Sequence, residues 1–545
     1  MKRVLACMIL LLSLPLSTGP RAQQAPNRPG ADPAIRLVLL VVVDQFRHDY
    51  LTRFGTEYSG AFSSLLSRGA TFTNANLEHY PTVTAVGHAT MLTGATPSVH
   101  GIVGNDWYDR GTNGSVTSVS DPTTKVVGAQ VEGAGSSPRR LLVGTVGDEL
   151  KMASLAAPGS DRAPRVVSLS LKDRSAILMG GHMADLALWF DQGAGAFVTS
   201  TYYRAEFPAW ASEFNAKKLP DSFAGKPWTF LTPSPGPTRV MPAEPGVKLY
   251  QAIAATPFGN DLLVDLAEAA LTAEKLGQRG VTDLFAVSFS ANDGVGHAYG
   301  PDSPEVRDIS IKTDKQIERL LARVDALVGA GRTLVIFTSD HGVAPLPELQ
   351  ASRRMPGGRV KAADLFTPIQ TALEQRFGAG KWILATAGSS PYLNHALIAE
   401  KKLDGAEVRE VARQAAVGLP NVARVYSREQ LLRGQVPPDM IGRRLVGSHH
   451  PQRSGDLEIL LNAYWIRSST GTTHGTTYWY DAHIPLIFAG PGIRQGRYDQ
   501  PVALNDLAPT LATLLGLQTP AGAEGRVIEG VLHELPPAGA RRPTP

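Results

Sequence analysis

The chain has 545 residues, of which 43% are hydrophobic and 19% are charged, and its formal net charge is +4. This composition excludes a disordered chain, and the length predicts either one large elaborated domain or two ordinary ones. The charge is small and no block of consecutive Lys or Arg is present, so neither a nucleic-acid partner nor a basic membrane-binding surface is expected.

The N-terminus has the pattern of a secretory signal. Lys2 and Arg3 precede a mainly apolar run over residues 4–16, and a polar stretch follows it. The run is shorter than the ~20 residues of a membrane-spanning helix, so we expect a signal peptide over residues 1–22, no membrane anchor, and a periplasmic or secreted protein. Cys7 is the only cysteine, and no apolar segment precedes it, which argues against lipidation and leaves the mature chain without disulfides.

Apolar, β-branched runs alternate with helical patterns along the rest of the chain. The predicted buried parallel strands are residues 36–43, 166–171, 283–289, 332–338 and 484–488. Helical periodicity is clearest over residues 308–328, a further helix is expected over residues 260–275, and Asn505 can cap a last one that ends before Gly516. This order predicts an α/β fold with a mostly parallel central sheet flanked by helices.

Two stretches interrupt this rhythm and are interpreted as insertions. They cover residues 191–255, which are rich in Pro and aromatic residues, and residues 346–451. The first is equally compatible with a cap above the catalytic edge and with a peripheral excursion. We therefore predict one catalytic domain over residues 31–535 with two cap-type insertions, followed by a Pro-rich tail over residues 536–545.

Acidic residues follow three of the predicted strands. Asp44 ends the run LVLLVVVD, Asp293 ends FAVSFSAND, and Asp340 ends TLVIFTSD. Ligands of open parallel sheets bind beyond the carboxyl ends of the strands, where these residues are expected to meet. Each Asp alone is more typical of a helix cap, but His341 follows Asp340 directly and His297 lies four residues after Asp293. Carboxylate and imidazole together favour zinc.

A candidate nucleophile lies in the segment YPTVTAVGHATMLTG, residues 80–94. Thr84 is expected at the start of a helix, where backbone N–H groups and the helix dipole favour a phosphate anion. Its hydroxyl is a weak nucleophile at neutral pH, but coordination to a metal ion held by the nearby Asp and His residues could remove its proton. Thr82 competes with Thr84 for this role, and a plain helix cap explains either residue equally well.

With these motifs in place, the chain resembles the alkaline phosphatase superfamily, and within it the exported enzymes that use a threonine nucleophile and are related to nucleotide pyrophosphatase/phosphodiesterases. The resemblance runs from about residue 36 to residue 517. It is carried by VVVDQFRHDY, YPTVTAVGHATMLTG, TPSVHGIVGNDWYD, SLKDRSAI, ANDGVGHAYGPDS, TSDHG, TTHG and LNDLAPTLATLLGL.

The resemblance implies two Zn²⁺ ions and a phosphothreonine intermediate on Thr84. The ligands that it implies for the first ion are Asp44, Thr84, Asp340 and His341, and those for the second are Asp293, His297 and His474. His483, nine residues after His474, is the alternative to it. We interpret His88 and His100 as supporting or packing residues, and we do not expect His449 and His450 to form a further metal site.

Phosphate contacts distinguish a monoesterase from a diesterase, since the metals alone do not. Lys172 and Arg174 occupy alternate positions in SLKDR and can point to the same side, and Asn105 in VGNDW adds an amide donor. A dianionic phosphoryl group favours such donors, although a surface ion pair with Asp173 would also explain the two cations. The threonine-type monoesterases have an Asn, a Lys and an Arg at these motif positions, and the related diesterases lack the Lys and Arg.

We therefore predict a zinc-dependent alkaline phosphatase that hydrolyses a broad range of small-molecule phosphate monoesters. The alternative is a phosphodiesterase or nucleotide pyrophosphatase of the same superfamily. A phosphotransferase and a zinc-dependent binding protein without turnover are weaker alternatives, and the intact set of Thr84, Lys172 and Arg174 argues against the second. The sequence leaves the oligomeric state open, with a monomer favoured.

Overall fold

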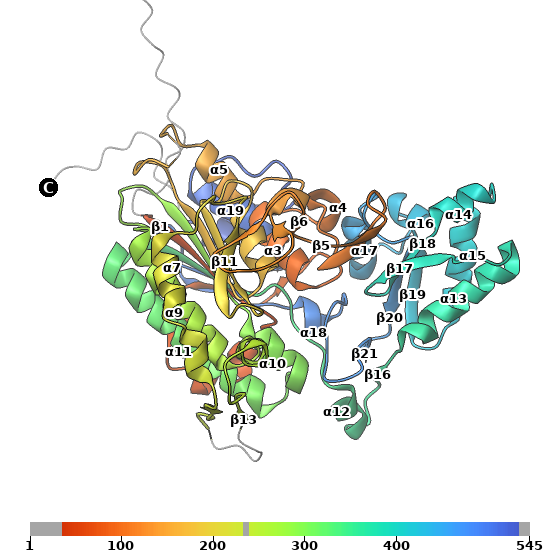
Figure 1. The fold of residues 1–545 in the computed structure, drawn as a ribbon, viewed down its shortest axis with the longest axis horizontal. Coiled ribbons are helices and arrows are strands. Elements are labelled where there is room, and N and C mark those ends of the chain that lie inside the picture. The colour runs from red at the N-terminus through yellow and green to blue at the C-terminus, as the bar shows by residue number, and fades with distance from the viewer. Residues whose placement is uncertain (1–34, 158, 233–238, 534–545) are drawn as a thin grey trace, which may run out of the picture.

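A ten-stranded sheet forms the centre of the molecule (Figure 1). The computed structural model describes residues 35–157, 159–232 and 239–533. The expected signal peptide and Pro-rich tail lie outside these residues. The strand order is β23-β2-β22-β15-β1-β14-β9-β10-β11-β7.

The middle of the sheet is parallel. Its strands are β15 (Thr333–Thr338), β1 (Leu37–Val43), β14 (Asp283–Phe289), β9 (Val166–Ser170) and β10 (Leu186–Asp191). Every residue of β1 is buried, because its odd-numbered side chains enter the apolar core on one face and its even-numbered ones enter the core on the other. The α/β fold class predicted from the sequence is confirmed.

The strand predicted over residues 484–488 is not parallel to its neighbours. It forms β22 (Leu486–Ala489), which pairs antiparallel with β15 and with β2 (Ala70–Phe72). The chain enters β22 from α18 (Trp479–Ala482), which lies beside the loop that follows β15, since Gly342 N and Val343 N bond to Asp481 O and Tyr480 O. A strand that starts at the carboxyl edge of the sheet must run back antiparallel.

Helices cover both faces of the sheet. One face carries α2 (Ala61–Arg68), α9 (Pro257–Ala273) and α11 (Pro304–Val328), and the other carries α3 (Thr84–Thr93), α5 (Val146–Met152) and α19 (Leu507–Leu514). Asn505 does not cap α19, because it lies inside the 3-10 turn Leu504–Asp506 that precedes the helix. Among the described residues, no helix is both long enough and apolar enough to cross a bilayer.

The stretch over residues 191–255 packs on the α9 and α11 side. Trp228 is buried there, and its Nε1 donates to Asp308 of α11 at 2.6 Å. The elements of this stretch are β11 (Ala196–Ser200), α7 (Ala209–Ala216), β12 (Pro227–Trp228), β13 (Arg239–Val240) and α8 (Val247–Ile253).

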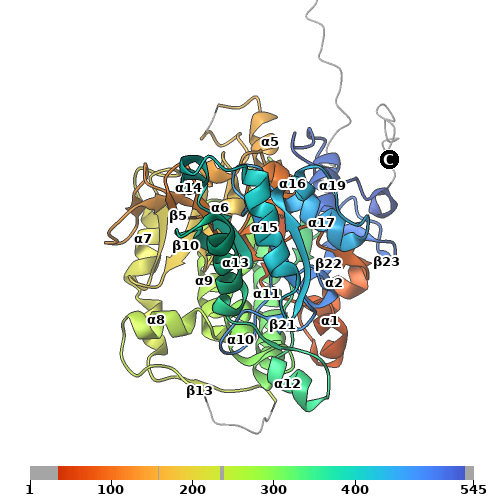
Figure 2. The same cartoon turned by 90° about the vertical axis from the view of Figure 1, so that its right-hand side faces the viewer.

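The stretch that begins near residue 346 forms a lobe with its own apolar core (Figure 1), and Figure 2 shows its helices facing the viewer. Its core contains Trp382 and Ile459. Its main elements are α13 (Ala362–Phe377), β17 (Ile383–Ala387), β18 (Ser390–Leu393), α15 (Gly405–Val417), β19 (Val422–Ser427), α16 (Arg428–Leu432), α17 (Met440–Ser448), β20 (Leu457–Leu461) and β21 (Trp465–Ile466).

Candidate active site

Two groups of potential metal ligands gather at the carboxyl edge of the parallel strands. Asp44 follows β1, Asp340 and His341 follow β15, and Asp293 lies in α10 (Ala291–Tyr299) directly after β14. Asp44, Asp340 and His341 form one group, and Asp293, His297 and His474 form the other. Within each group, one ligand atom from every residue lies within 4.8 Å of the others.

The first group is fully buried. His341 Nε2 lies 3.5 Å from Asp44 Oδ1 and 3.4 Å from Asp340 Oδ2. Neither of these two carboxylate oxygens accepts a hydrogen bond from any described residue. Burial and the neighbouring Asp340 carboxylate raise the pKa of Asp44 well above its usual value. A buried, unbonded pair of carboxylate oxygens is unfavourable without a cation, so these residues fit a metal ion.

The second group is more open. Asp293 Oδ1 lies 3.2 Å from His297 Nε2 and 3.6 Å from His474 Nε2. Burial alone would raise the pKa of Asp293, but Lys172 and His297 hold this pKa well below its usual value.

All three histidines are held by backbone carbonyls in the same way. The Nδ1 atoms of His297, His341 and His474 lie 2.8, 2.9 and 2.8 Å from the carbonyl oxygens of Thr472, Gly342 and Thr82. A carbonyl only accepts hydrogen bonds, so each Nδ1 carries the proton and each Nε2 lone pair is left for a metal. Carboxylate and imidazole donors in groups of three suit zinc.

Lys172 connects the two groups. Its Nζ donates to Asp44 Oδ2 at 2.7 Å and to Asp293 Oδ2 at 2.6 Å. Burial alone would lower the pKa of Lys172, but these two carboxylates raise it above its usual value. The lysine therefore stays charged at the centre of the site.

Thr84 begins α3 and is 1% exposed. Its Oγ1 lies 3.4 Å from both His341 Nε2 and Lys172 Nζ. The competing Thr82 hydroxyl instead donates to Thr476 O at 2.8 Å, where it supports the loop of His474. Of the two threonines, Thr84 is the one whose hydroxyl contacts the candidate ligands.

Asn105 contacts the start of α3, and Arg174 lies in the first turn of the helix that follows Lys172. Asn105 Oδ1 accepts from Ala85 N at 2.9 Å, which leaves its amide N–H groups available to a ligand. Arg174, in α6 (Asp173–Gly180), is 3.9 Å from Asp173, a distance too long for a hydrogen bond, and its buried Nε has no hydrogen-bond partner among the described residues.

Sequence reasoning missed Gln45. Its backbone adopts a positive φ of 65°, its N–H donates to Asp340 Oδ1 at 3.1 Å, and its Nε2 donates to Asp293 Oδ1 at 2.6 Å. A Cβ on Gly296 would collide with Gln45 Oε1, so the glycine makes room for this contact. Gly296, the second glycine of DGVGH, is the feature of the sequence that could have indicated this contact.

The remaining histidines lie outside both groups. His88 supports the first group, since its Nδ1 is 2.8 Å from Thr84 O and 3.2 Å from Asp340 Oδ2. His483 Nε2 bonds to Thr73 O at 2.9 Å, and His100 Nε2 shares a hydrogen bond with Thr90 Oγ1 at 3.3 Å. His449 and His450 lie in the lobe, and neither belongs to a group of three candidate ligands in the described part of the chain.

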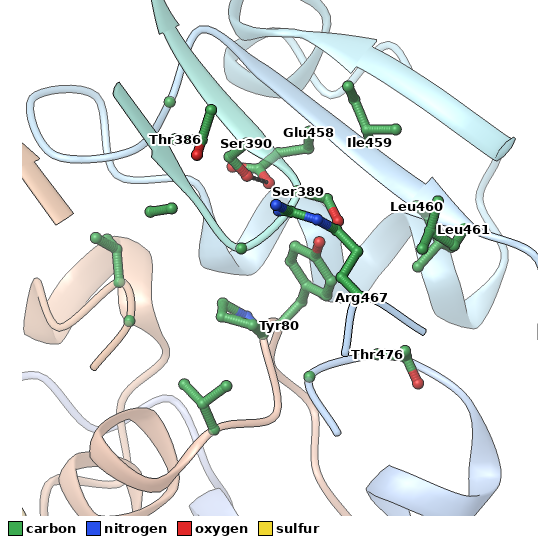
Figure 3. Close-up of a pocket in the computed structure, with 18 of the residues that line it drawn as sticks. Tyr80, Thr386, Ser389, Ser390, Glu458, Ile459, Leu460, Leu461, Arg467 and Thr476 are labelled. Atoms are coloured by element: carbon green, nitrogen blue, oxygen red, sulfur yellow. Dashed lines mark hydrogen bonds between the residues drawn. The ribbon is translucent and has the colours of Figure 1, made fainter. Parts of the chain in front are cut away.

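A cavity of about 470 Å³ opens from the second group toward the lobe (Figure 3). Its wall includes His297, His474 and Asn105 on the catalytic side. On the other side it is formed by the β17–β18 turn, β20, β21 and Arg467.

This fold and site define a known class of enzymes. The sequence matches the type I phosphodiesterase / nucleotide pyrophosphatase family over residues 38–481, and the chain belongs to that family. The relationship to the alkaline phosphatase superfamily inferred from the motifs is confirmed.

Within this class, the chain is similar to proteins named as alkaline phosphatases. It is 36% identical to alkaline phosphatase PafA of Elizabethkingia meningoseptica, with 93% of this chain and 96% of that protein covered. It is 34% identical to alkaline phosphatase PhoV of Synechococcus elongatus, with coverages of 98% and 100%. The crystal structure of PafA superposes with a TM-score of 0.85 over 92% of this chain and 99% of that one.

Proposed function

We propose that this protein is a zinc-dependent alkaline phosphatase that hydrolyses a broad range of phosphate monoesters through a phosphothreonine at position 84. The observation that carries the proposal is the position of the Thr84 hydroxyl, 3.4 Å from both His341 Nε2 and Lys172 Nζ at the start of a helix. The names of PafA and PhoV support the same activity.

Two zinc ions would be held by the two groups of ligands, with Thr84 completing the first. Bound there, the ions would lower the pKa of the Thr84 hydroxyl and neutralise charge on the attacking and leaving oxygens of an in-line displacement. The Nδ1–H···O=C bonds of the three histidines keep their Nε2 atoms turned to the ligand positions.

The chain's own groups account for the covalent steps. Thr84 Oγ1 gives its proton to solvent and attacks phosphorus, the bond from phosphorus to the ester oxygen breaks, that oxygen leaves as an alcohol with a proton taken up from water, and a phosphothreonine forms. Water then attacks this intermediate, so that inorganic phosphate leaves and the hydroxyl is restored. The N–H groups at the start of α3 and the Lys172 ammonium stabilise the negative charge on the phosphoryl oxygens.

The donors around Thr84 favour a monoester over a diester. Lys172, Arg174 and Asn105 offer two cations and an amide to a phosphoryl group that has no second ester substituent. A solved variant of PafA combines a threonine-to-serine change with asparagine-, lysine- and arginine-to-alanine changes, the same residue types as at this site. The family name also covers phosphodiesterases, which keeps that activity as the alternative.

Turnover of an aryl phosphate monoester and of its alkyl diester by wild type and Arg174→Ala tests this proposal. Loss of a charge-assisted contact predicts a fall in monoester kcat/KM of about 10- to 100-fold, with little change for the diester. Equal losses for both esters, or a wild-type preference for the diester, would contradict it.

Two further parts of the proposal rest on the sequence. The charged and then apolar N-terminus supports removal of residues 1–22 on export to the periplasm or medium. Residues 31–535 would then act as one catalytic domain in which residues 191–255 and 346–451 are insertions, in a protein that works as a monomer.

A further inference from the structure

The cavity shown in Figure 3 lies on the leaving-group side of the site. It is lined by His297 and His474 of the second group, whereas Asp44, Asp340 and His341 of the first group are absent from its described lining. In an in-line displacement at phosphorus the leaving oxygen departs opposite Thr84, which contacts the first group. On the proposed function, the alcohol part of the substrate therefore occupies this cavity, whose volume of about 470 Å³ suits a small organic group.

One cation in the lining of this cavity forms no ion pair with a carboxylate of the described residues. Arg467 follows β21, and in Figure 3 its side chain extends toward the turn that holds Ser389 and Ser390. Among the described residues, its buried Nε has no hydrogen-bond partner, and no carboxylate contributes to the shift of its pKa. Its guanidinium carbon lies 5.0 Å from the ring centre of Phe366, which fixes the side chain against the lobe. Burial lowers the pKa of Arg467, yet an arginine at this depth remains charged.

The carboxylate of the same wall, Glu458, bonds to a serine rather than to Arg467. Glu458 on β20 accepts a hydrogen bond from the Ser390 hydroxyl, drawn as a dashed line in Figure 3, and its other oxygen lies 3.8 Å from His449 Nδ1. Asp106, the other acid of the lining, is exposed at the rim. A partly desolvated guanidinium that faces a cavity without a partner is unfavourable unless a ligand supplies the anion.

We propose that Arg467 is a specificity-determining residue that binds an anionic group, a carboxylate or a second phosphate, on the leaving group of the substrate. The favoured substrates are accordingly phosphate monoesters of alcohols or phenols that carry such a group. The planar guanidinium binds either anion through paired N–H donors, and the neighbouring hydroxyls of Ser389 and Tyr80 can complete the contact.

The test uses two aryl phosphates that differ only in this charge. One carries a carboxymethyl group and the other a carbamoylmethyl group, and the methylene keeps the leaving phenols nearly equal in acidity. We measure the ratio of their kcat/KM values for wild type, Arg467→Met, Arg467→Lys and the control Arg433→Met, an exposed arginine outside the cavity. A charge-assisted contact predicts that Arg467→Met lowers the ratio by about tenfold through the carboxymethyl ester alone. We expect the kcat/KM ratio of Arg467→Lys to lie between those of wild type and Arg467→Met, and the ratio of Arg433→Met to equal that of wild type.

Equal losses for both esters in Arg467→Met, or an unchanged ratio, would overturn the proposal. If Arg467→Met does not fold, two other measurements test the proposal: the kcat/KM ratio of Arg467→Lys and the salt dependence of the wild-type ratio. An electrostatic contact is refuted if the ratio is unchanged in Arg467→Lys and does not respond to salt. Repeating the comparison with aryl phosphates bearing a second phosphate identifies which anion is preferred. Failure of the proposed function is distinct, because wild type would then hydrolyse neither ester.

Discussion

Replacing Gln45 by Met should weaken one metal position and spare the other. The substitution keeps the length of the side chain but removes the donor that lies 2.6 Å from Asp293 Oδ1. The backbone N–H of residue 45, which bonds to Asp340 Oδ1 at 3.1 Å, is unchanged. The two metal positions should respond differently because the side chain of residue 45 contacts the second group, whereas its backbone contacts the first.

The size of the effect follows from the chemistry of this contact. It is a short, buried hydrogen bond to an ionised carboxylate, and such a bond contributes about 1.5–3 kcal/mol. Removing an outer-shell partner of this kind costs about 10- to 100-fold in metal affinity. We expect Gln45→Met to bind one zinc ion with the affinity of wild type. Binding of the second zinc ion, and therefore activity, should require a free zinc concentration about 10- to 100-fold higher.

The assay is a zinc titration of the metal-free enzyme in metal buffers, with bound zinc and monoester turnover followed together. Gly296→Ala should reproduce the selective loss, because its new Cβ displaces the Gln45 amide. Gly418→Ala is the matched control, since a Cβ there meets open space and the residue has an ordinary negative φ. Equal weakening of both ions, or wild-type affinity in Gln45→Met, would refute this account of Gln45.

Three other outcomes are expected. Chelation of zinc should abolish monoester turnover and lower the melting temperature, and added zinc should restore both. Gly87→Ala should reduce kcat by about 100-fold without changing the leaving-group preference, because the new Cβ meets the Asp340 backbone and pushes α3, which carries the proposed nucleophile, away from the first group. Asp456→Asn should destabilise the protein by about 2 kcal/mol at neutral pH in urea unfolding, because burial would raise the pKa of Asp456 but His395 and Arg110 lower it to about 2. The pKa of Asp456 is lower in the folded than in the unfolded protein, so its stabilising effect is present above the unfolded-state pKa of about 4 and is lost as the pH falls toward 2. The difference in unfolding free energy between wild type and Asp456→Asn should therefore shrink at pH 3.

The sequence was most informative where an apolar strand ends in a residue with a chemical role. Asp44, Asp293 and Asp340 could be placed together because parallel strands end at one edge of a sheet, and the structure brings them there. Their roles as ligands remain predictions. The choice between Thr82 and Thr84 was open because it depends on where the helix begins, and the backbone of α3 decides that.

Other features had no local signature. Gln45 reaches Asp293 only because its backbone adopts a left-handed conformation and Gly296 leaves space, and both conditions arise from tertiary contacts. The direction of the strand at residues 486–489 depends on where the chain enters the sheet, which an apolar run does not record. Arg467 was not singled out, because an isolated Arg in a sequence is usually a surface residue.

The candidate ligands extend from residue 44 to residue 474 of the 545-residue chain. Asp44 directly follows the first strand and His474 lies in a loop that follows the lobe, so a fragment that lacks either residue could not assemble both groups. Contacts between residues so distant in sequence form late in folding. Metal capture should therefore be among the last events. If residues 1–22 are removed as proposed, the remaining chain has no cysteine, and metal ions bound at the two groups would join remote segments as disulfides do in many exported proteins.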